Sequence, residues 1–329
     1  MQNIVQFKKE LFSVTRETFA DKALELFRYQ AEACAVYRDF LQYLDISVGS
    51  ITKMEDIPFL PIELFKSRKI LSGDIDTNFY FESSGTTSSI NSRHYVYDEN
   101  IYKESIIHSF NHFFGDVKNY CLLALLPTYL ERPNASLVYM CRELMLQSGN
   151  DKNGFYLDDL EGLQKIILQN ESNQIPTILI GVSFALIELA EKFPMHLSNT
   201  IIMETGGMKG RREEITRAEL HQILTTAFNT KNIYSEYGMT ELLSQAYSKG
   251  NSVFFTPSWM KIIIRDTEDP FTILPQEKTG CINIIDLANI YSCAFIATQD
   301  LGKIHADGSF EVLGRFDNSD VRGCNLMVE

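Results

Sequence analysis

From residue 79 onward, short apolar runs alternate with amphipathic stretches, and this alternation restricts the fold more than any other feature of the sequence. Four runs are typical of buried strands: "YCLLALLP" at 120–127, "PTILIGV" at 176–182, "NTIIMETGG" at 199–207 and "KNIYSEYG" at 231–238. The helix-like stretch "EEITRAELHQILTTAF" lies between the last two. Strands that alternate with helices predict an α/β fold with a parallel sheet, whose ligands bind beyond the carboxyl ends of the strands.

The two ends of the chain show different patterns. Near the N-terminus, "ALELFRYQAEACAVYRDFLQYL" repeats apolar residues at the three- and four-residue spacing of helices. After residue 254, short strand-like runs such as "KIIIRD", "CINIIDL" and "FEVLGR" follow with little helix between them. We therefore expect three segments: a helical segment over 1–75, an α/β core over 76–253, and a small β-rich subdomain over 254–329.

Composition narrows the class of protein. The 329 residues are 45% apolar and 22% charged, as in ordinary soluble enzymes, and the net charge of −13 disfavours a nucleic-acid partner. The six cysteines include no C-x-x-C pair, so the sequence suggests neither a zinc site nor a redox pair. The N-terminus lacks the apolar core of a signal peptide, and no apolar run is long enough to span a bilayer. We expect a cytoplasmic protein without a membrane span.

A row of small hydroxyl residues, "SSGTTSS" at 83–89, follows the strand-like "NFYFE". A glycine between hydroxyl residues lets backbone N–H and side-chain O–H groups point at one anion. The row is not a Walker A loop, because the lysine of that motif is absent. By itself it fits a phosphate loop and a polar surface turn equally well.

A second signal, "YGMTE" at 237–241, ends the last strand-like run. In one interpretation a turn leads into a helix, with Thr240 as its cap and Glu241 in its first turn. In the other, Tyr237 lies against an adenine ring and Glu241 binds Mg²⁺, a hard cation that prefers oxygen ligands.

These two motifs precede "TQDLG" at 298–302 and "LGRFDNSDVRG" at 313–323, and this order resembles that of the adenylate-forming superfamily of acyl-CoA synthetases and luciferases. Within it, the chain is most similar to the acyl-protein synthetase subunit of bacterial luminescence fatty-acid reductase. The stretches "LLPTYLERPNASLVYM" and "ETGGMKGRREEITRAEL" carry that similarity. The resemblance implies the large domain of these enzymes, with parallel sheets flanked by helices and a small β-rich subdomain, without their mobile C-terminal domain.

The resemblance also implies roles for individual residues toward ATP and Mg²⁺. Ser83, Ser84, Gly85, Thr86 and Thr87 would hold the phosphates; Gly206, Gly207, Tyr237 and Gly238 would frame the adenine; Asp300 and Arg315 would bind the ribose; Glu241 would hold Mg²⁺, with Thr240 beside it in the catalytic motif. Hydrogen bonds from ribose hydroxyls to Asp300 are sound chemistry in any family, because an ionised carboxylate only accepts.

The sequence departs from these relatives in two ways. The phosphate loop lacks their following proline and lysine, so Arg93 is the nearest positive charge. The chain also stops just after the hinge-like motif, before the domain that carries a catalytic lysine in most relatives. That lysine would be replaced, supplied by another group or dispensed with, and Lys209 is a candidate substitute.

Three further candidates come from the residues themselves. "GVSFA" around Ser183 lacks the last glycine of a nucleophile elbow, and we expect a packed strand-to-helix turn that lines an acyl pocket. His108 and His112 are spaced i, i+4 without the glutamate of a metalloprotease, so we expect a helical pair rather than a zinc site. Cys324 lies close to Arg322, and we expect it to be accessible and locally basic; both features favour a reactive thiolate. In acyl-protein synthetases a cysteine near the C-terminus accepts the acyl group.

The resulting hypothesis is an AMP-forming ligase that activates a carboxylic acid, expected to be a fatty acid, and passes the acyl group to a thiol on Cys324 or on a partner. The partner would be an acyl reductase or an acyl carrier protein. Three alternatives stay open at this point: a ligase that uses coenzyme A or an acyl carrier protein, a non-catalytic nucleotide-binding subunit, and an acyltransferase that uses no ATP.

Overall fold

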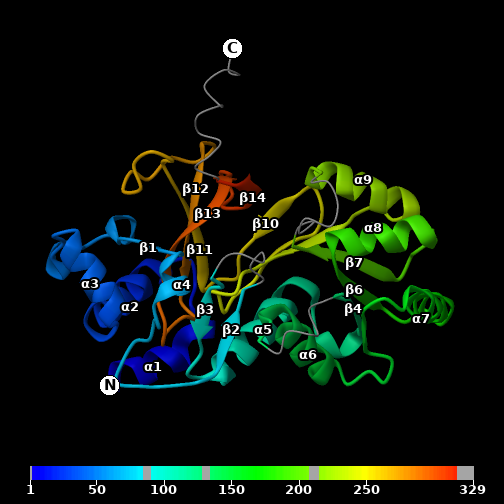
Figure 1. The fold of residues 1–329 in the computed structure, drawn as a ribbon, viewed down its shortest axis with the longest axis horizontal. Coiled ribbons are helices and arrows are strands. Elements are labelled where there is room, and N and C mark those ends of the chain that lie inside the picture. The colour runs from blue at the N-terminus through cyan, green and yellow to red at the C-terminus, as the bar shows by residue number, and fades with distance from the viewer. Residues whose placement is uncertain (1, 84–89, 128–133, 207–214, 317–329) are drawn as a thin grey trace, which may run out of the picture. The chain divides into compact units, whose positions relative to one another are not determined.

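The computed structural model describes residues 2–83, 90–127, 134–206 and 215–316, and the chain divides into two compact units (Figure 1). The central unit comprises residues 81–84 and 99–257, and the terminal unit comprises residues 1–80, 85–98 and 258–329. This division follows contacts in space, whereas the predicted segments 1–75, 76–253 and 254–329 follow changes in sequence pattern and stay a prediction. Within the described part of the chain, no helix combines the length and the apolar character that crossing a bilayer requires.

The central unit is built on a sheet in the order β5-β4-β6-β7-β8-β9-β10. Its strands are β4 (Cys121–Leu125), β5 (Gly154–Tyr156), β6 (Thr177–Val182), β7 (Thr200–Thr205), β8 (Tyr234–Tyr237), β9 (Ala246–Ser248) and β10 (Val253–Phe255). The neighbours from β5 to β8 pair in parallel, and β9 and β10 continue the sheet in antiparallel pairs. Every residue of β4 and β6 is buried, as expected for strands that helices cover on both faces.

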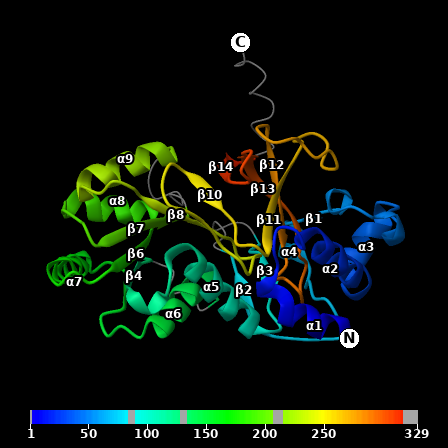
Figure 2. The same cartoon turned by 180° about the vertical axis from the view of Figure 1, so that it is seen from behind.

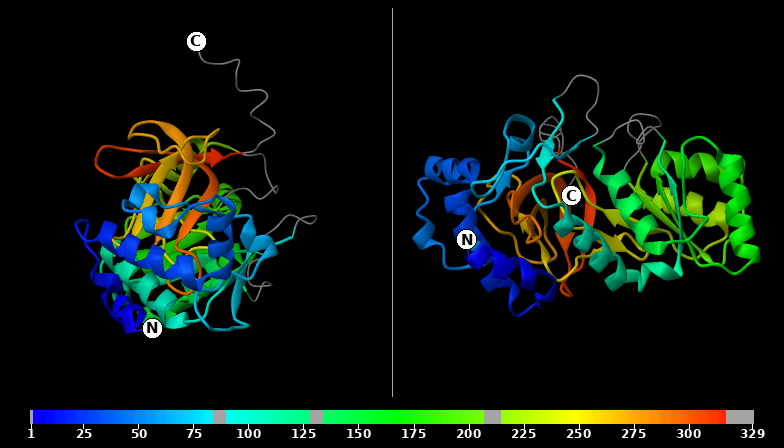
Figure 3. Two further views of the ribbon diagram at one scale, coloured as in Figure 1. Left: turned by 90° about the vertical axis from the view of Figure 1, so that its left-hand side faces the viewer. Right: turned by 90° about the horizontal axis from the view of Figure 1, so that it is seen from below.

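Helices lie on both faces of this sheet (Figures 1 and 3). They are α5 (Glu99–Phe114), α6 (Ser136–Ser148), α7 (Leu160–Ser172), α8 (Ser183–Lys192) and α9 (Arg217–Phe228), with a 3-10 turn η4 (Val117–Asn119). Helices α5 and α6 cover one face, and α8 and α9 cover the other. Because β7 leads to β8 through α9, the two strands run in parallel and end at the same edge of the sheet.

The terminal unit contains a second set of strands, most of them from the end of the chain. They are β1 (Leu60–Pro61), β3 (Arg93–Tyr95), β11 (Met260–Arg265), β12 (Thr279–Asp286), β13 (Phe295–Ile304) and β14 (Phe310–Arg315), while β2 (Tyr80–Glu82) lies where the chain leaves this unit. Strands β11 to β14 pair in antiparallel order, and β1 pairs with β13 in parallel. The β-rich texture predicted after residue 254 is confirmed.

N-terminal helices cover these strands (Figure 2). They are α1 (Gln2–Glu10), α2 (Phe19–Ala33), α3 (Ala35–Tyr43) and the short α4 (Leu64–Ser67), with 3-10 turns η1 (Leu11–Ser13), η2 (Val48–Ser50) and η3 (Met54–Asp56). Rings of α2 and α3 contact β13: the centroids of Phe27 and Tyr37 lie 6.1 and 6.0 Å from that of Phe295. The N-terminal and C-terminal parts of the sequence thus share one core.

Gln30 joins these two parts by hydrogen bonds. Its side chain is fully buried in α2. The amide nitrogen donates to the carbonyls of Asn289 and Ile290 at 2.7 and 3.1 Å, and the amide oxygen accepts from the Ala294 N–H at 2.9 Å. One side chain therefore satisfies three backbone groups in the connection between β12 and β13.

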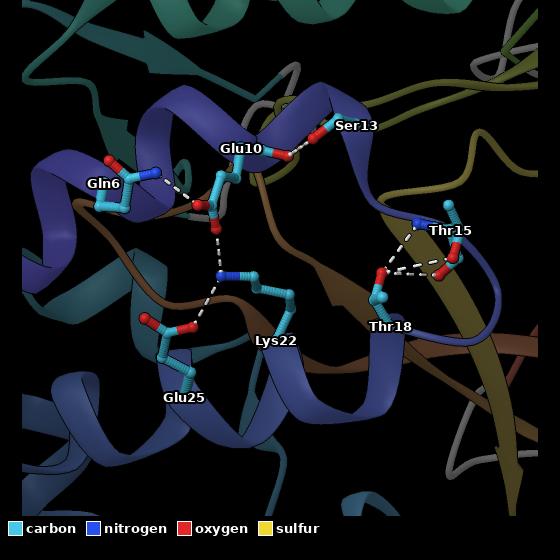
Figure 4. Close-up of polar contacts among 7 residues, drawn as sticks. All are labelled: Gln6, Glu10, Ser13, Thr15, Thr18, Lys22 and Glu25. Atoms are coloured by element: carbon cyan, nitrogen blue, oxygen red, sulfur yellow. Dashed lines mark hydrogen bonds and ion pairs between the residues drawn. The ribbon is translucent and has the colours of Figure 1, made fainter.

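Lys22 fixes the first helix against the second (Figure 4). Its ammonium lies 2.6 Å from Glu10 of α1 and 2.9 Å from Glu25 of α2, and Gln6 also donates to Glu10. The Lys22 ammonium is also 5.3 Å from the centroid of the Phe7 ring. These contacts align the polar edges of α1 and α2, whose apolar faces enter the core.

Beyond Tyr43 the chain differs from the helical part before it. The chain there forms 3-10 turns, the strand β1 and the one-turn helix α4. Pro58 and Pro61 explain the difference, because proline donates no backbone hydrogen bond and disfavours helix in the residue before it. The extended segment instead pairs Leu60 with Ile296 of β13.

Candidate active site

The ends of β7 and β8 bring together the residues that follow them in sequence. Thr205 and Glu236 are register partners in the two parallel strands. Gly206 comes directly after the first strand, and Tyr237 and Gly238 stand at and beyond the end of the second. Three residues predicted to frame an adenine therefore lie at one edge of the central sheet, where parallel α/β sheets bind ligands.

Gly206 needs to be a glycine for a conformational reason. Its φ of 70° lies in the left-handed region, which side chains other than glycine rarely adopt. Its carbonyl accepts a hydrogen bond of 2.8 Å from the Ser183 hydroxyl. Ser183 is buried at the first position of α8, directly after β6, so the predicted strand-to-helix turn is confirmed.

Tyr237 is 8% exposed, and its ring meets Phe254 of β10 edge-on at 6.0 Å between centroids. Gly238 follows in a crowded place: a Cβ there would lie 2.4 Å from the Glu236 carboxylate. A side chain at this position would displace Glu236. The glycine thus lets the chain turn away from β8 beside the tyrosine.

Thr240 and Glu241 do not begin a helix, so that interpretation is wrong. Residues 238–245 form turns, and β9 then returns antiparallel to β8. The pairing of β9 with β8 overrides the local helix propensity of "TELLSQ". Glu241 is only 5% exposed, so its carboxylate is held within the central unit.

Two acidic groups near this edge, the buried Glu204 and the half-buried Glu236, were not predicted. Glu204 of β7 forms an ion pair with Arg217, from Nε to Oε1 at 3.1 Å, and the same oxygen lies 3.6 Å from His221 Nε2. Glu236 accepts a hydrogen bond of 2.6 Å from the Thr205 hydroxyl. Burial, with a smaller effect of the Glu204 charge, raises the pKa of Glu236 to about 7. The i, i+4 spacing of Arg217 and His221 indicates that both lie on one face of α9, but the sequence does not show that this face meets Glu204.

In the terminal unit, Asp300 and Arg315 are register partners on β13 and β14. Their side chains approach to 3.9 Å between Nε and Oδ1, with Asp300 17% exposed and Arg315 85% exposed. The two predicted ribose ligands therefore lie together.

Arg265 and Thr298 hold the strand that carries Asp300. A bulge interrupts the β12–β13 pairing between Cys281 and Asn283. The carbonyl of Ile282 there accepts from Arg265 at 2.9 Å and from the Thr298 hydroxyl at 2.8 Å. The Asp300 N–H in turn donates to the Thr298 hydroxyl oxygen at 3.1 Å.

The sequence profile of the LuxE acyl-protein synthetases matches residues 12–329. The chain belongs to the LuxE acyl-protein synthetase family. The comparison with curated proteins finds no match for this LuxE-family chain.

Solved structures of adenylate-forming ligases share the fold of this LuxE-family protein. ATP-bound MatB from Rhodopseudomonas palustris is 16% identical with a TM-score of 0.54, over 73% of this chain and 49% of MatB. A 2-hydroxyisobutyryl-CoA ligase in the postadenylation state is 10% identical with a TM-score of 0.65, over 94% and 70%. The long-chain-fatty-acid-CoA ligase FadD1 from Archaeoglobus fulgidus is 14% identical with a TM-score of 0.51, over 74% and 54%. The LuxE-family chain thus spans about half the length of MatB, and the predicted adenylate-forming fold is confirmed.

Several predicted residues lie outside the described part of this LuxE-family chain: Ser84, Gly85, Thr86, Thr87, Gly207, Lys209 and Cys324. Ser83 is described, half-buried after β2, and Arg93 lies on β3 with its guanidinium 5.0 Å from the Tyr80 ring centroid. His108 and His112 are both exposed on α5, and no cluster of three metal-binding side chains occurs among the described residues.

Five of the six cysteines lie in the described part of the chain. Cys34, Cys121, Cys141, Cys281 and Cys293 are all buried and free of disulfides. Burial raises the pKa of each of these five thiols. A buried thiol with a raised pKa is a poor nucleophile, because the thiolate is the reactive form.

Proposed function

We propose that this protein activates a carboxylic acid with ATP to give acyl-AMP and pyrophosphate, and then passes the acyl group to the thiol of Cys324. The observation that carries the first half is the place of "YGMTE": it leaves the carboxyl end of β8 beside Gly206 at the end of β7. Membership of the acyl-protein synthetase family supports the second half.

The nucleotide would be held at several points. Tyr237, Gly238, Gly206 and Gly207 would frame the adenine, and residues 83–87 would bind the phosphates through N–H and O–H groups. The paired Asp300 and Arg315 would bind the ribose, because a carboxylate accepts from both sugar hydroxyls. With the substrate carboxylate aligned on the α-phosphorus, its oxygen attacks, the bond to the β-phosphate breaks, and pyrophosphate leaves. Positioning and charge stabilisation would supply most of the acceleration.

Glu241 fits a magnesium site of the kind found with nucleotides. Mg²⁺ in such sites takes one or two carboxylates and completes its shell with phosphate oxygens and water. A single buried carboxylate therefore suffices, and no larger acidic cluster is needed. When bound, the ion would neutralise charge on the phosphates, and Thr240 would lie beside it in the same turn.

The acceptor proposal rests on accessibility. In acyl transfer the thiolate attacks the carbonyl carbon of acyl-AMP, a thioester forms, and AMP leaves with the electron pair of the broken C–O bond. The five described cysteines are buried with raised pKa values, whereas Cys324 lies next to Gly323 and near Arg322 in a sequence that favours a thiolate. We further propose a fatty acid as substrate, an acyl reductase or acyl carrier protein as partner, and a cytoplasmic location.

Pyrophosphate exchange tests the activation step. The protein is expected to exchange labelled pyrophosphate into ATP only when Mg²⁺ and a suitable acid, chosen from a panel of chain lengths, are present. Absence of exchange while ATP still binds would favour the non-catalytic subunit. Failure to bind ATP together with acylation from a ready-made acyl donor would favour the ATP-independent acyltransferase.

The transfer step has its own readout. Wild-type protein given ATP, Mg²⁺ and the acid should gain one acyl group on Cys324, seen by intact mass and peptide mapping and removed by neutral hydroxylamine. Cys324→Ser should retain exchange and lose the label, and Cys293→Ser, at a buried thiol, should retain both. Acylation of coenzyme A without a protein thioester would favour the CoA ligase.

A further inference from the structure

We propose that Arg217 is a positioning residue for the adenine pocket, because its guanidinium connects the end of β7 to Tyr237 through Phe254. This inference rests on the proposed function, in which Gly206 and Tyr237 frame the base. No role for Arg217 follows from the four motifs of the sequence, which lie elsewhere.

The first connection is the ion pair with Glu204. The Glu204 side chain is 4% exposed and that of Arg217 is 27% exposed, with 3.1 Å between Nε and Oε1. A carboxylate this deeply buried requires a partner charge. Glu204 stands two residues before Gly206, so the pair fixes the end of β7 from which the adenine loop leaves.

The second connection passes through two aromatic rings. The guanidinium carbon of Arg217 lies 5.0 Å from the centroid of Phe254, within the range of a cation–π contact. Phe254 is fully buried and meets Tyr237 at 6.0 Å with an interplanar angle of 62°. Phe254 therefore contacts both Arg217 and Tyr237, the residue predicted to stack on the adenine.

The backbone at Arg217 is fixed independently of these contacts. Arg217 is the first residue of α9, which begins with a capping box between Thr216 and Glu219. One turn further, His221 faces the same Glu204 oxygen at 3.6 Å and the Ser235 hydroxyl of β8 at 3.4 Å. The helix dipole opposes a cation in the first turn, so the contacts with Glu204 and Phe254 offset a local cost.

A merely structural arginine and a positioning arginine predict different binding. If Arg217 positions the adenine pocket, its loss should weaken ligands that carry the base and spare ligands that do not. Inorganic tripolyphosphate presents the phosphates of ATP without adenosine. The comparison of ATP with tripolyphosphate, each with Mg²⁺, therefore separates the two roles.

The experiment measures both dissociation constants by calorimetry for the full chain. Arg217→Met is expected to weaken ATP binding on the order of 10-fold, or about 1.4 kcal/mol, with tripolyphosphate within roughly twofold of wild type. Arg217→Lys keeps the charge but lacks the planar guanidinium, and should lose less. Arg142→Met, at an exposed position of α6, should change neither constant. Phe254→Leu removes the aromatic link without leaving Glu204 unpaired, and should repeat the ATP-selective loss.

Equal weakening of both ligands, or no change in either, for Arg217→Met and Phe254→Leu would overturn the positioning role. A different result would be that the wild-type protein binds ATP no more tightly than tripolyphosphate. That result would contradict the adenine site itself, and with it the proposed function.

Discussion

Three glutamates at or just after the ends of β7 and β8 have three different surroundings. Glu204 has a cationic partner in Arg217, and Glu241 is buried in the turn after β8. Glu236 instead accepts from the neutral Thr205 hydroxyl and has a pKa of about 7. Glutamates near one edge of the sheet therefore differ in their surroundings, and we expect substitutions of Glu241 and Glu236 to have different effects.

For Glu241 we predict a loss of rate rather than of binding. Glu241→Gln places a neutral amide, which is a poorer Mg²⁺ ligand, at the proposed metal site, so acid-dependent pyrophosphate exchange should fall on the order of 10²–10³-fold. The dissociation constant of ATP should change far less. Glu104→Gln, at an exposed position of α5, is the control and should leave exchange intact. Exchange at the wild-type rate in Glu241→Gln would remove Glu241 from the site.

For Glu236 we predict an effect on stability that depends on pH. Because burial raises its folded pKa above the ordinary value, the folded state holds the proton more tightly than the unfolded state between about pH 4.5 and 7. Stability due to this group therefore falls as pH rises through that window. Glu236→Gln cannot ionise and can still accept from Thr205, so the variant should exceed wild type by about 2 kcal/mol at pH 8 and by much less at pH 5.

The measurement is urea unfolding of both proteins across this pH range. Glu171→Gln serves as a comparison of opposite sign. Burial opposes ionisation of Glu171, but hydrogen bonds from Thr200, Ser198 and Asn199 outweigh it and lower its pKa. Its contribution to stability is present above the ordinary pKa and is lost in acid. Parallel pH profiles for wild type and Glu236→Gln would contradict a neutral buried carboxyl.

At the scale of elements, periodicity predicted the helices α2, α3 and α9 and the strands β4, β6, β7 and β8. Runs such as those of β4 and β6 are apolar throughout because both faces are covered. The absence of a helix at Thr240 and Glu241 could not be predicted, because antiparallel pairing of β9 with β8 is a non-local interaction that overrides helix propensity. The contacts of Glu204 with Arg217 and His221 could not be predicted for the same reason, because nothing in the local sequence shows that α9 lies over the end of β7.

Residues of the candidate site could be predicted only where they belong to a sequence motif. Tyr237, Gly206 and the pair Asp300 and Arg315 stand in recognisable stretches, and the structure brings each set together within its own unit. The residues that support them, such as Arg265 at the β12–β13 bulge, belong to no motif. Their roles depend on which backbone carbonyl the fold leaves unpaired, and sequence patterns do not reveal this.

At the scale of the whole molecule, the terminal unit depends on contacts between residues that are 259 to 264 positions apart in the sequence. We predict that Gln30→Leu, which keeps the volume but removes the hydrogen bonds to residues 289–294, lowers the free energy of unfolding by about 3 kcal/mol. Urea unfolding measures the change. Gln42→Leu, at an exposed position of α3, should change it by less than about 0.5 kcal/mol. Equal effects of the two substitutions would show that Gln30 is not the link described.

The split terminal unit has a consequence for the order of events on the ribosome. Helices α1 to α3 emerge first, yet Phe295 and the other β13 residues that complete their core emerge after residue 257. At roughly 5–20 residues per second, the synthesis between α3 and Phe295 takes on the order of 10–50 s. During that interval the central unit can fold, whereas the apolar faces of the N-terminal helices stay unpaired because β13 has not yet been synthesised. A nascent chain with such a delay is a natural client for chaperones that bind exposed apolar helices.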